Sequence, residues 1–150
     1  MKYASETEIN LPVEKVLELF DSVENLKHWQ PGFLSFEHIS GTPGEVGAKS
    51  KLKYKSGGRV IEMVETITKK NLPHEFNGTY EAKGVYNTIE NKFTRISSAK
   101  TKWSFSCEFI FNSLLMKLFA FLFSGMFKKQ SVKTLHNFKN FAENGTSIVK

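Results

Sequence analysis

The hydrophobic pattern at the start of the chain predicts one strand followed by two short helices. Residues 1–10 alternate, with Tyr3 and Ile9 on one side and acidic residues on the other, which is typical of a strand. Pro12 begins a helix, because proline is favoured in a first turn and apolar residues follow it at helical spacing. A second helix is expected from residue 23 to about residue 29, where a Pro-Gly pair ends it.

The middle of the chain predicts six more strands joined by short turns. The clearest alternation places Leu52 and Tyr54 on one face and lysines on the other. Residues 59–68 carry apolar side chains on both faces, so the inward face of this strand stays open. Asn77-Gly78 is a rival signal for a hairpin turn inside a strand. The strands are expected at residues 33–39, 50–55, 59–68, 75–82, 86–96 and 101–111. This succession favours an antiparallel meander.

Residues 113–143 predict a helix far longer than any other element, with a weak point at Ser124-Gly125. Its first half is apolar almost all round, whereas its second half is amphipathic and carries lysines. The apolar stretch 114–127 contains Lys117 and is shorter than the roughly 20 residues that a transmembrane helix needs. We therefore expect its first half to be covered by the sheet, a ligand, a second subunit or a membrane surface.

Length and composition indicate a single folded domain, residues 1–150. Apolar residues make up 40% of the chain and aromatic residues 13%, which offsets the ordering entropy and excludes disorder. The only cysteine, Cys107, excludes an intrachain disulfide and a cysteine-cluster metal site. No apolar core follows Met1 and Lys2, so we expect no secretory signal and a cytoplasmic setting.

The positive charge of the chain is concentrated in its second half. The formal net charge is +6, made up of −1 over residues 1–75 and +7 over residues 76–150. Five lysines and no acidic residue lie between Phe109 and Ala142. Such a block fits nucleic acid, an anionic membrane surface, an acidic ligand or a solvated helix face. We expect no nucleic-acid binding, because the basic residues belong to no recognised reading motif.

Aromatic side chains gather on strand faces that would look toward the long helix. In the last predicted strand, Trp103, Phe105 and Phe109 alternate with polar residues. A bent sheet that grips one helix leaves space between them, and these rings would line it. A domain of this size also needs aromatic residues for its core, so packing alone is the competing interpretation of the fourteen phenylalanines.

The order of elements and several local segments resemble one known superfamily. The segments are residues 12–16 at the first helix, the Trp-Pro segment 28–32, the glycine-spaced turn 41–47, and Lys100-Thr101 at the turn into the last strand. Together they resemble the START-like (SRPBCC) superfamily, which includes the birch-pollen allergen, polyketide cyclases and dehydrases, and coenzyme Q-binding proteins. The resemblance implies the α+β helix-grip fold: a seven-stranded curved antiparallel sheet, with two short helices after the first strand, wrapping a long C-terminal helix. It also implies an apolar cavity between sheet and helix.

The residues expected to line this cavity come from the strand faces and the long helix. They are Trp29, Tyr54, Tyr80, Ile89, Asn91, Trp103, Phe105, Phe109, Phe119 and Phe123. No catalytic constellation stands out. The four histidines are isolated and lack ligand-like spacing, so we expect neither a metal nor a cofactor. Polar groups that would serve an enzyme inside the cavity are Asn91, Tyr80, Arg95 and whichever of Glu62 and Glu65 faces inward.

We therefore expect the protein to bind a hydrophobic or amphipathic small molecule, lipid-like or polycyclic, in the helix-grip cavity. One alternative is a polyketide cyclase or dehydrase acting on such a ligand. Another is docking to a membrane surface or a partner through the C-terminal helix, where Phe119, Phe121, Phe123 and Phe127 point in too many directions for one sheet to cover. A homodimer through this helix is the self-complementary form of that contact.

Overall fold

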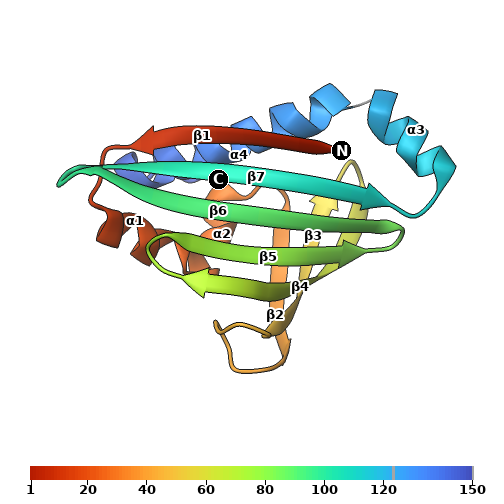
Figure 1. Ribbon diagram of the computed structural model, residues 1–150, viewed down its shortest axis with the longest axis horizontal. Helices are drawn as coiled ribbons and strands as arrows, with labels where there is room; N and C mark the ends of the chain where they lie inside the picture. The colour runs from red at the N-terminus through yellow and green to blue at the C-terminus, as the bar shows by residue number, and fades with distance from the viewer. Residues whose placement is uncertain (123, 150) are drawn as a thin grey trace.

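The strands of the computed structural model, which describes residues 1–122 and 124–149, form one antiparallel sheet in the order β1-β7-β6-β5-β4-β3-β2 (Figure 1). Their bounds are β1 Lys2–Ile9, β2 Phe33–Ser40, β3 Lys49–Ser56, β4 Arg59–Asn71, β5 Glu75–Ala82, β6 Val85–Ser97 and β7 Lys100–Phe111. From β2 to β7 each strand pairs with the next in the chain, as in a meander, and β1 adds to the free edge of β7.

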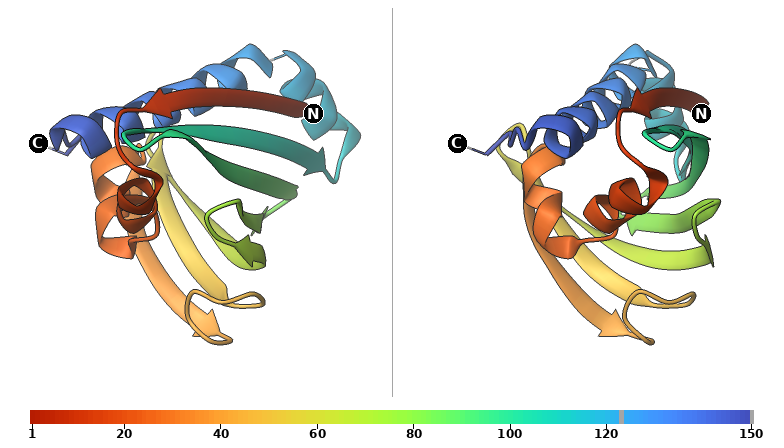
Figure 2. Two further views of the ribbon diagram at one scale, coloured as in Figure 1. Left: turned by 60° about the vertical axis from the view of Figure 1, so that its left-hand side comes forward. Right: turned by 90° about the vertical axis from the view of Figure 1, so that its left-hand side faces the viewer.

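The helices lie in two groups. Between β1 and β2 come α1 (Val13–Phe20), a short 3₁₀ turn η1 (Val23–Asn25) and α2 (Leu26–Trp29). After β7 come α3 (Leu114–Leu122) and α4 (Ser124–Asn144). Figure 2 shows the sheet curling from β1 round to β2, with α4 along its concave side and α1 and α2 at one end. This is the helix-grip architecture, and the sequence-based prediction of the fold is confirmed.

Turn chemistry determines the register of the β3–β4 hairpin. Ser56 pairs with Arg59, which leaves Gly57 and Gly58 as a two-residue loop. Both glycines have positive φ, +56° and +83°, as the mirror-image turns of tight hairpins require. The rival signal at Asn77-Gly78 is wrong, since both residues lie inside β5. A larger side chain at position 78 would press on the neighbouring backbone, because a Cβ there would lie 3.1 Å from the Thr66 carbonyl oxygen.

The long helix predicted over residues 113–143 is described as two helices, on either side of residue 123. Its second part begins at Ser124, where the sequence predicts a weak point, and α3 and α4 run in different directions (Figure 1). None of the described helices is both long enough and apolar enough to cross a membrane.

A cluster of aromatic rings packs α4 onto the sheet. The Phe138 ring is completely buried, and its centroid lies 5.0 Å from that of Trp29, 5.3 Å from Trp103 and 5.7 Å from Phe20. The rings therefore come from α1, α2, β7 and α4. Tilted and edge-on contacts of this kind add to the free energy gained by apolar burial.

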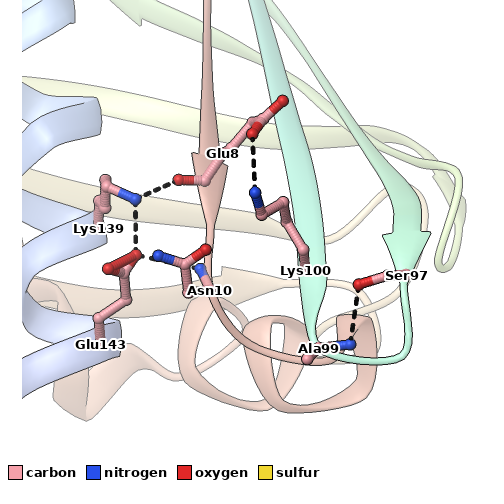
Figure 3. Close-up of polar contacts among 7 residues, drawn as sticks. All are labelled: Glu8, Asn10, Ser97, Ala99, Lys100, Lys139 and Glu143. Carbon is pink, nitrogen blue, oxygen red and sulfur yellow. Dashed lines mark hydrogen bonds and ion pairs between the residues drawn. The ribbon is translucent and has the colours of Figure 1, made fainter.

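Polar contacts fasten the same part of α4 to β1 (Figure 3). The Lys139 ammonium donates to the Glu8 carbonyl oxygen and pairs with the Glu143 carboxylate at 2.6 Å. The Asn10 backbone N–H also donates to Glu143, at 3.1 Å. Burial alone would raise the pKa of Glu143, but these two partners hold it below its usual value.

Removing the Phe138 ring should destabilise the whole domain. We expect Phe138→Ala to lower the free energy of unfolding by about 3–5 kcal/mol, because a large buried ring leaves a cavity. Urea unfolding followed by tryptophan fluorescence measures the change. Phe121→Ala is the matched control, since this ring is 76% exposed and its loss should change stability by less than about 0.5 kcal/mol. Equal losses in the two variants would contradict the packing argument.

Candidate ligand-binding site

A cavity lies between the concave face of the sheet and the helices. It has two lobes of about 360 and 330 Å³. Both lobes are lined by Trp29, Tyr54, Tyr80 and Asn91, so they meet at these side chains. Each lobe is at the lower end of the roughly 300–1,000 Å³ range that is usual for small-molecule sites.

Most residues predicted from the sequence lie together around the second lobe. Those that line it are Trp29, Tyr54, Tyr80, Ile89, Asn91, Trp103, Phe105 and Phe109. Phe119 does not line either lobe and is 57% exposed, because α3 lies at the end of the sheet away from α1. Phe123 lies outside the described residues. Three aromatic rings outside the predicted set also line this lobe: Tyr3, Phe20 and Phe127. Phe127 of α4, which the sequence analysis assigned to the uncovered phenylalanines, lies 5.4 Å from Phe109 between ring centroids. That these residues hold a ligand stays a prediction.

The structure settles which face of β4 points inward. Met63, Glu65 and Ile67 line the cavity, whereas Glu62 is 51% exposed and pairs with lysines on the outer face. Glu65 stands directly opposite Tyr80 in the β4–β5 ladder. The Tyr80 hydroxyl donates to the Glu65 carboxylate at 2.7 Å. A carboxyl and a phenol therefore meet inside an otherwise largely apolar cavity.

Burial governs the ionisation of these polar groups. It raises the pKa of Glu65, although the hydrogen bond from Tyr80 opposes the effect, and the nearby charge of Asp21 raises it further. Burial, together with the charge of Glu65, raises the pKa of Tyr80 and of Tyr54. Both phenols therefore stay protonated as donors, and the Tyr54 hydroxyl donates to the side-chain oxygen of Gln30.

Asn91, a further predicted polar group, is occupied by structural contacts. Its side chain donates to the Phe76 carbonyl oxygen at 3.0 Å and accepts from the Trp103 indole N–H at 2.9 Å. It thereby satisfies a buried donor in the aromatic wall. The buried indole N–H of Trp29 has no acceptor in the described part of the chain.

Two other side chains that could take part in catalysis, Arg95 and Cys107, are engaged by neighbouring residues instead. Arg95 is 52% exposed and pairs with Glu14 of α1, so it does not reach into the cavity. The Cys107 thiol donates to the Asn87 side-chain oxygen at 2.9 Å. Burial raises the pKa of Cys107, which favours the inert thiol over the nucleophilic thiolate.

The histidines do not converge on a metal site. Within the two described ranges, no three His, Cys, Asp or Glu side chains are placed to hold a metal ion. His28 contacts the chain end instead: its Nδ1 lies 2.8 Å from the Ser147 hydroxyl, and its ring stacks on Phe141 at 5.2 Å.

Several solved structures share this fold at low sequence identity. The Zhui aromatase/cyclase from Streptomyces sp. R1128 has a TM-score of 0.79 and 13% identity, over 95% of this chain and 93% of its own. The di-domain aromatase/cyclase StfQ, from the steffimycin biosynthetic pathway, has a TM-score of 0.73 and 14% identity, over 97% of this chain and 45% of its own. Ara h 8.0201 has a TM-score of 0.71 and 13% identity, over 95% of this chain and 97% of its own. At these identities the likeness shows the fold alone.

A comparison with protein families identifies the family of the chain, which the solved structures alone do not. A search of curated proteins gave no significant match. The family model for "polyketide cyclase / dehydrase and lipid transport", however, matches residues 1–143, nearly the whole chain. With its helix-grip fold and its cavity between sheet and helix, the chain belongs to this polyketide cyclase/dehydrase and lipid transport family.

Proposed function

We propose that the protein binds a hydrophobic or amphipathic small molecule, lipid-like or polycyclic, in the cavity between the sheet and α4. The observation that carries the proposal is an aromatic-walled cavity with a few polar groups converging in it, which is the usual constitution of a small-molecule site. The aromatic wall would contact the apolar body of the ligand, and the Glu65–Tyr80 pair would meet its polar end.

A second candidate function is a cyclase or dehydrase reaction on such a ligand. It is favoured by the same Glu65–Tyr80 pair, because dehydration needs acid and base groups positioned against the substrate. In this reaction the ionised Glu65 carboxylate takes a proton from the carbon next to a carbonyl. The protonated carboxyl then returns that proton to the departing hydroxyl group, which leaves as water as the carbon–carbon double bond forms.

Blocking the junction of the two lobes should abolish ligand uptake. Ile89 lines both lobes and stands opposite Gly78 and Cys107 in the neighbouring strands. We expect Ile89→Trp to weaken binding of Nile red, a neutral apolar dye, by about tenfold or more, because the indole would fill the shared space. Dye fluorescence during titration with protein measures the change.

Glu90→Trp is the control for this experiment, since it adds the same ring next along the strand at an exposed position outside both lobes. Dye binding that is equal in the wild type and both variants would contradict the proposal.

Native mass spectrometry of the purified protein, before and after incubation with a β-hydroxy ketone, distinguishes the binding function from the dehydrase function. Recovery of the compound unchanged favours binding, and loss of one water favours the dehydrase.

We further propose that α3 docks onto an anionic lipid surface. Its apolar side chains face outward on several sides, with Leu114 84% and Phe121 76% exposed. Lys117, Lys128, Lys129 and Lys133 lie within or after this helix, and none forms an ion pair with a described residue. Apolar side chains next to unpaired lysines fit the boundary between acyl chains and negatively charged headgroups.

Phe121→Asp should release the protein from anionic vesicles. We expect the wild type to float with vesicles containing phosphatidylserine and to do so less as salt is raised, because salt screens the lysines. Phe121→Asp should weaken this binding by about tenfold or more, since an apolar ring no longer enters the lipid. Ile39→Asp is the control: Ile39 is an exposed apolar residue on β2, at the opposite edge of the sheet from β1.

Vesicle binding that is insensitive to both salt and Phe121→Asp would refute membrane docking. A protein that ignores vesicles but dimerises in light scattering, and loses the dimer in Phe121→Asp, would assign this surface to a second copy of the chain.

A further inference from the structure

The charged groups inside the cavity are of one sign. Among the described residues that line either lobe there is no lysine or arginine, whereas Glu65 and Asp21 both contribute carboxyl groups. His38 also lines the first lobe. A chain with a formal net charge of +6 therefore presents carboxylates to whatever enters its cavity.

No cation within the described ranges faces Glu65. From β5 the Tyr80 hydroxyl donates to its carboxylate, and from β3 Tyr54 lies close enough for the Glu65 charge to raise the pKa of its phenol, which therefore stays neutral. Asp21, beyond α1, adds a second negative charge. A hydrogen bond from one neutral phenol compensates only part of the desolvation of a partly buried carboxylate.

The lysine at the border of the cavity, Lys70, pairs with Asp21 and not with Glu65. The Lys70 ammonium donates to the Gly44 carbonyl oxygen at 2.7 Å and pairs with Asp21 at 3.7 Å. It also lies 5.7 Å from the centre of the Phe76 ring. The lysines of β3 that lie near β4, Lys51 and Lys53, pair with Glu62 on the outer face.

We infer that the ligand presents a hydrogen-bond-donating polar end to Glu65, best a protonated amine and next a hydroxyl group, and that the cavity rejects a carboxylate end. This inference rests on the proposed binding function and names the ligand class. An ammonium group supplies the missing countercharge, and a hydroxyl group donates a hydrogen bond. A carboxylate would bring a second unpaired anion into the same site, so discrimination comes from repulsion as well as attraction.

Three probes that share the same alkyl chain and differ in their polar end group test the inference. Dodecylamine and dodecanoate, each below its micelle concentration, and 1-dodecanol below its solubility limit compete with Nile red for the cavity at about pH 7.5. We expect dodecylamine to displace the dye at about a tenfold lower concentration than dodecanoate, with dodecanol between them. Glu65→Gln should remove most of this preference, because the amide carries no charge.

Glu62→Gln is the matched control, since it makes the same change on the outer face of the same strand and should leave the ranking of the three probes unaltered.

Lowering the pH should weaken binding of the amine. The pKa of Glu65 is raised in the protein, so acidification through that value neutralises the carboxyl and weakens amine binding. This loss should occur in the wild type and in Glu62→Gln but not in Glu65→Gln.

The outcomes separate this inference from the proposed function. Nile red that fails to bind the wild type, or binds Ile89→Trp equally well, overturns the binding function itself. Dye binding with equal displacement by the three probes, or with dodecanoate strongest, leaves the function standing and overturns the ligand class. A measurement on the unaltered protein covers the case in which Glu65→Gln folds poorly. In carbon NMR, saturating dodecylamine should lower the pKa of the Glu65 carboxyl, and an unchanged value refutes the contact.

Discussion

The other features of this molecule depend on the clamp that holds one end of α4 against the sheet. Phe138 packs among rings from α1, α2 and β7, and Lys139 with Glu143 ties the same turns of α4 to β1. The fully buried side chains of α4 are confined to Leu135 and Phe138. A single helix fastened in this way covers only part of a curved seven-stranded sheet, so the remaining concave face borders a cavity rather than a second layer.

Glu65 is the position where this fold departs from the rules of a stable core. Its inward neighbours on β4, Met63 and Ile67, are apolar, and a leucine at position 65 would suit the same wall. A carboxyl there carries a desolvation cost that its raised pKa reflects, and the hydrogen bond from Tyr80 offsets only part of it. Residues that conflict with their surroundings in this way are characteristic of functional sites. The cost to stability and the selectivity that we infer thus arise from one side chain.

Much of the fold followed from local patterns, because strand alternation, proline and glycine positions act over a few residues. The inward face of β4 was left open, since both of its faces carry apolar side chains. The two-glycine loop nevertheless contains the missing information: pairing Ser56 with Arg59 places Leu52 opposite Met63, and partners in a ladder share a face. Strand pairing of this kind gives no information about Phe119, which lies in a helix. The direction of α3 relative to the sheet depends on tertiary packing, which the apolar pattern of the helix does not encode.

The distribution of charge connects the cavity with the exposed surface of α3, the two sites on which the proposals rest. The lysines of α3 and α4 that lack ion pairs with described residues lie outside the cavity, whereas the groups lining the cavity include carboxyls and no lysine or arginine among the described residues. The basic composition alone would suggest an acidic ligand, yet the interior has the opposite preference. An anionic lipid surface attracts the lysines of the helix and also concentrates amphiphiles with a protonated amine. Membrane docking and an amine-ended ligand are therefore electrostatically consistent, because the surface that attracts the protein also enriches the molecule that its cavity selects.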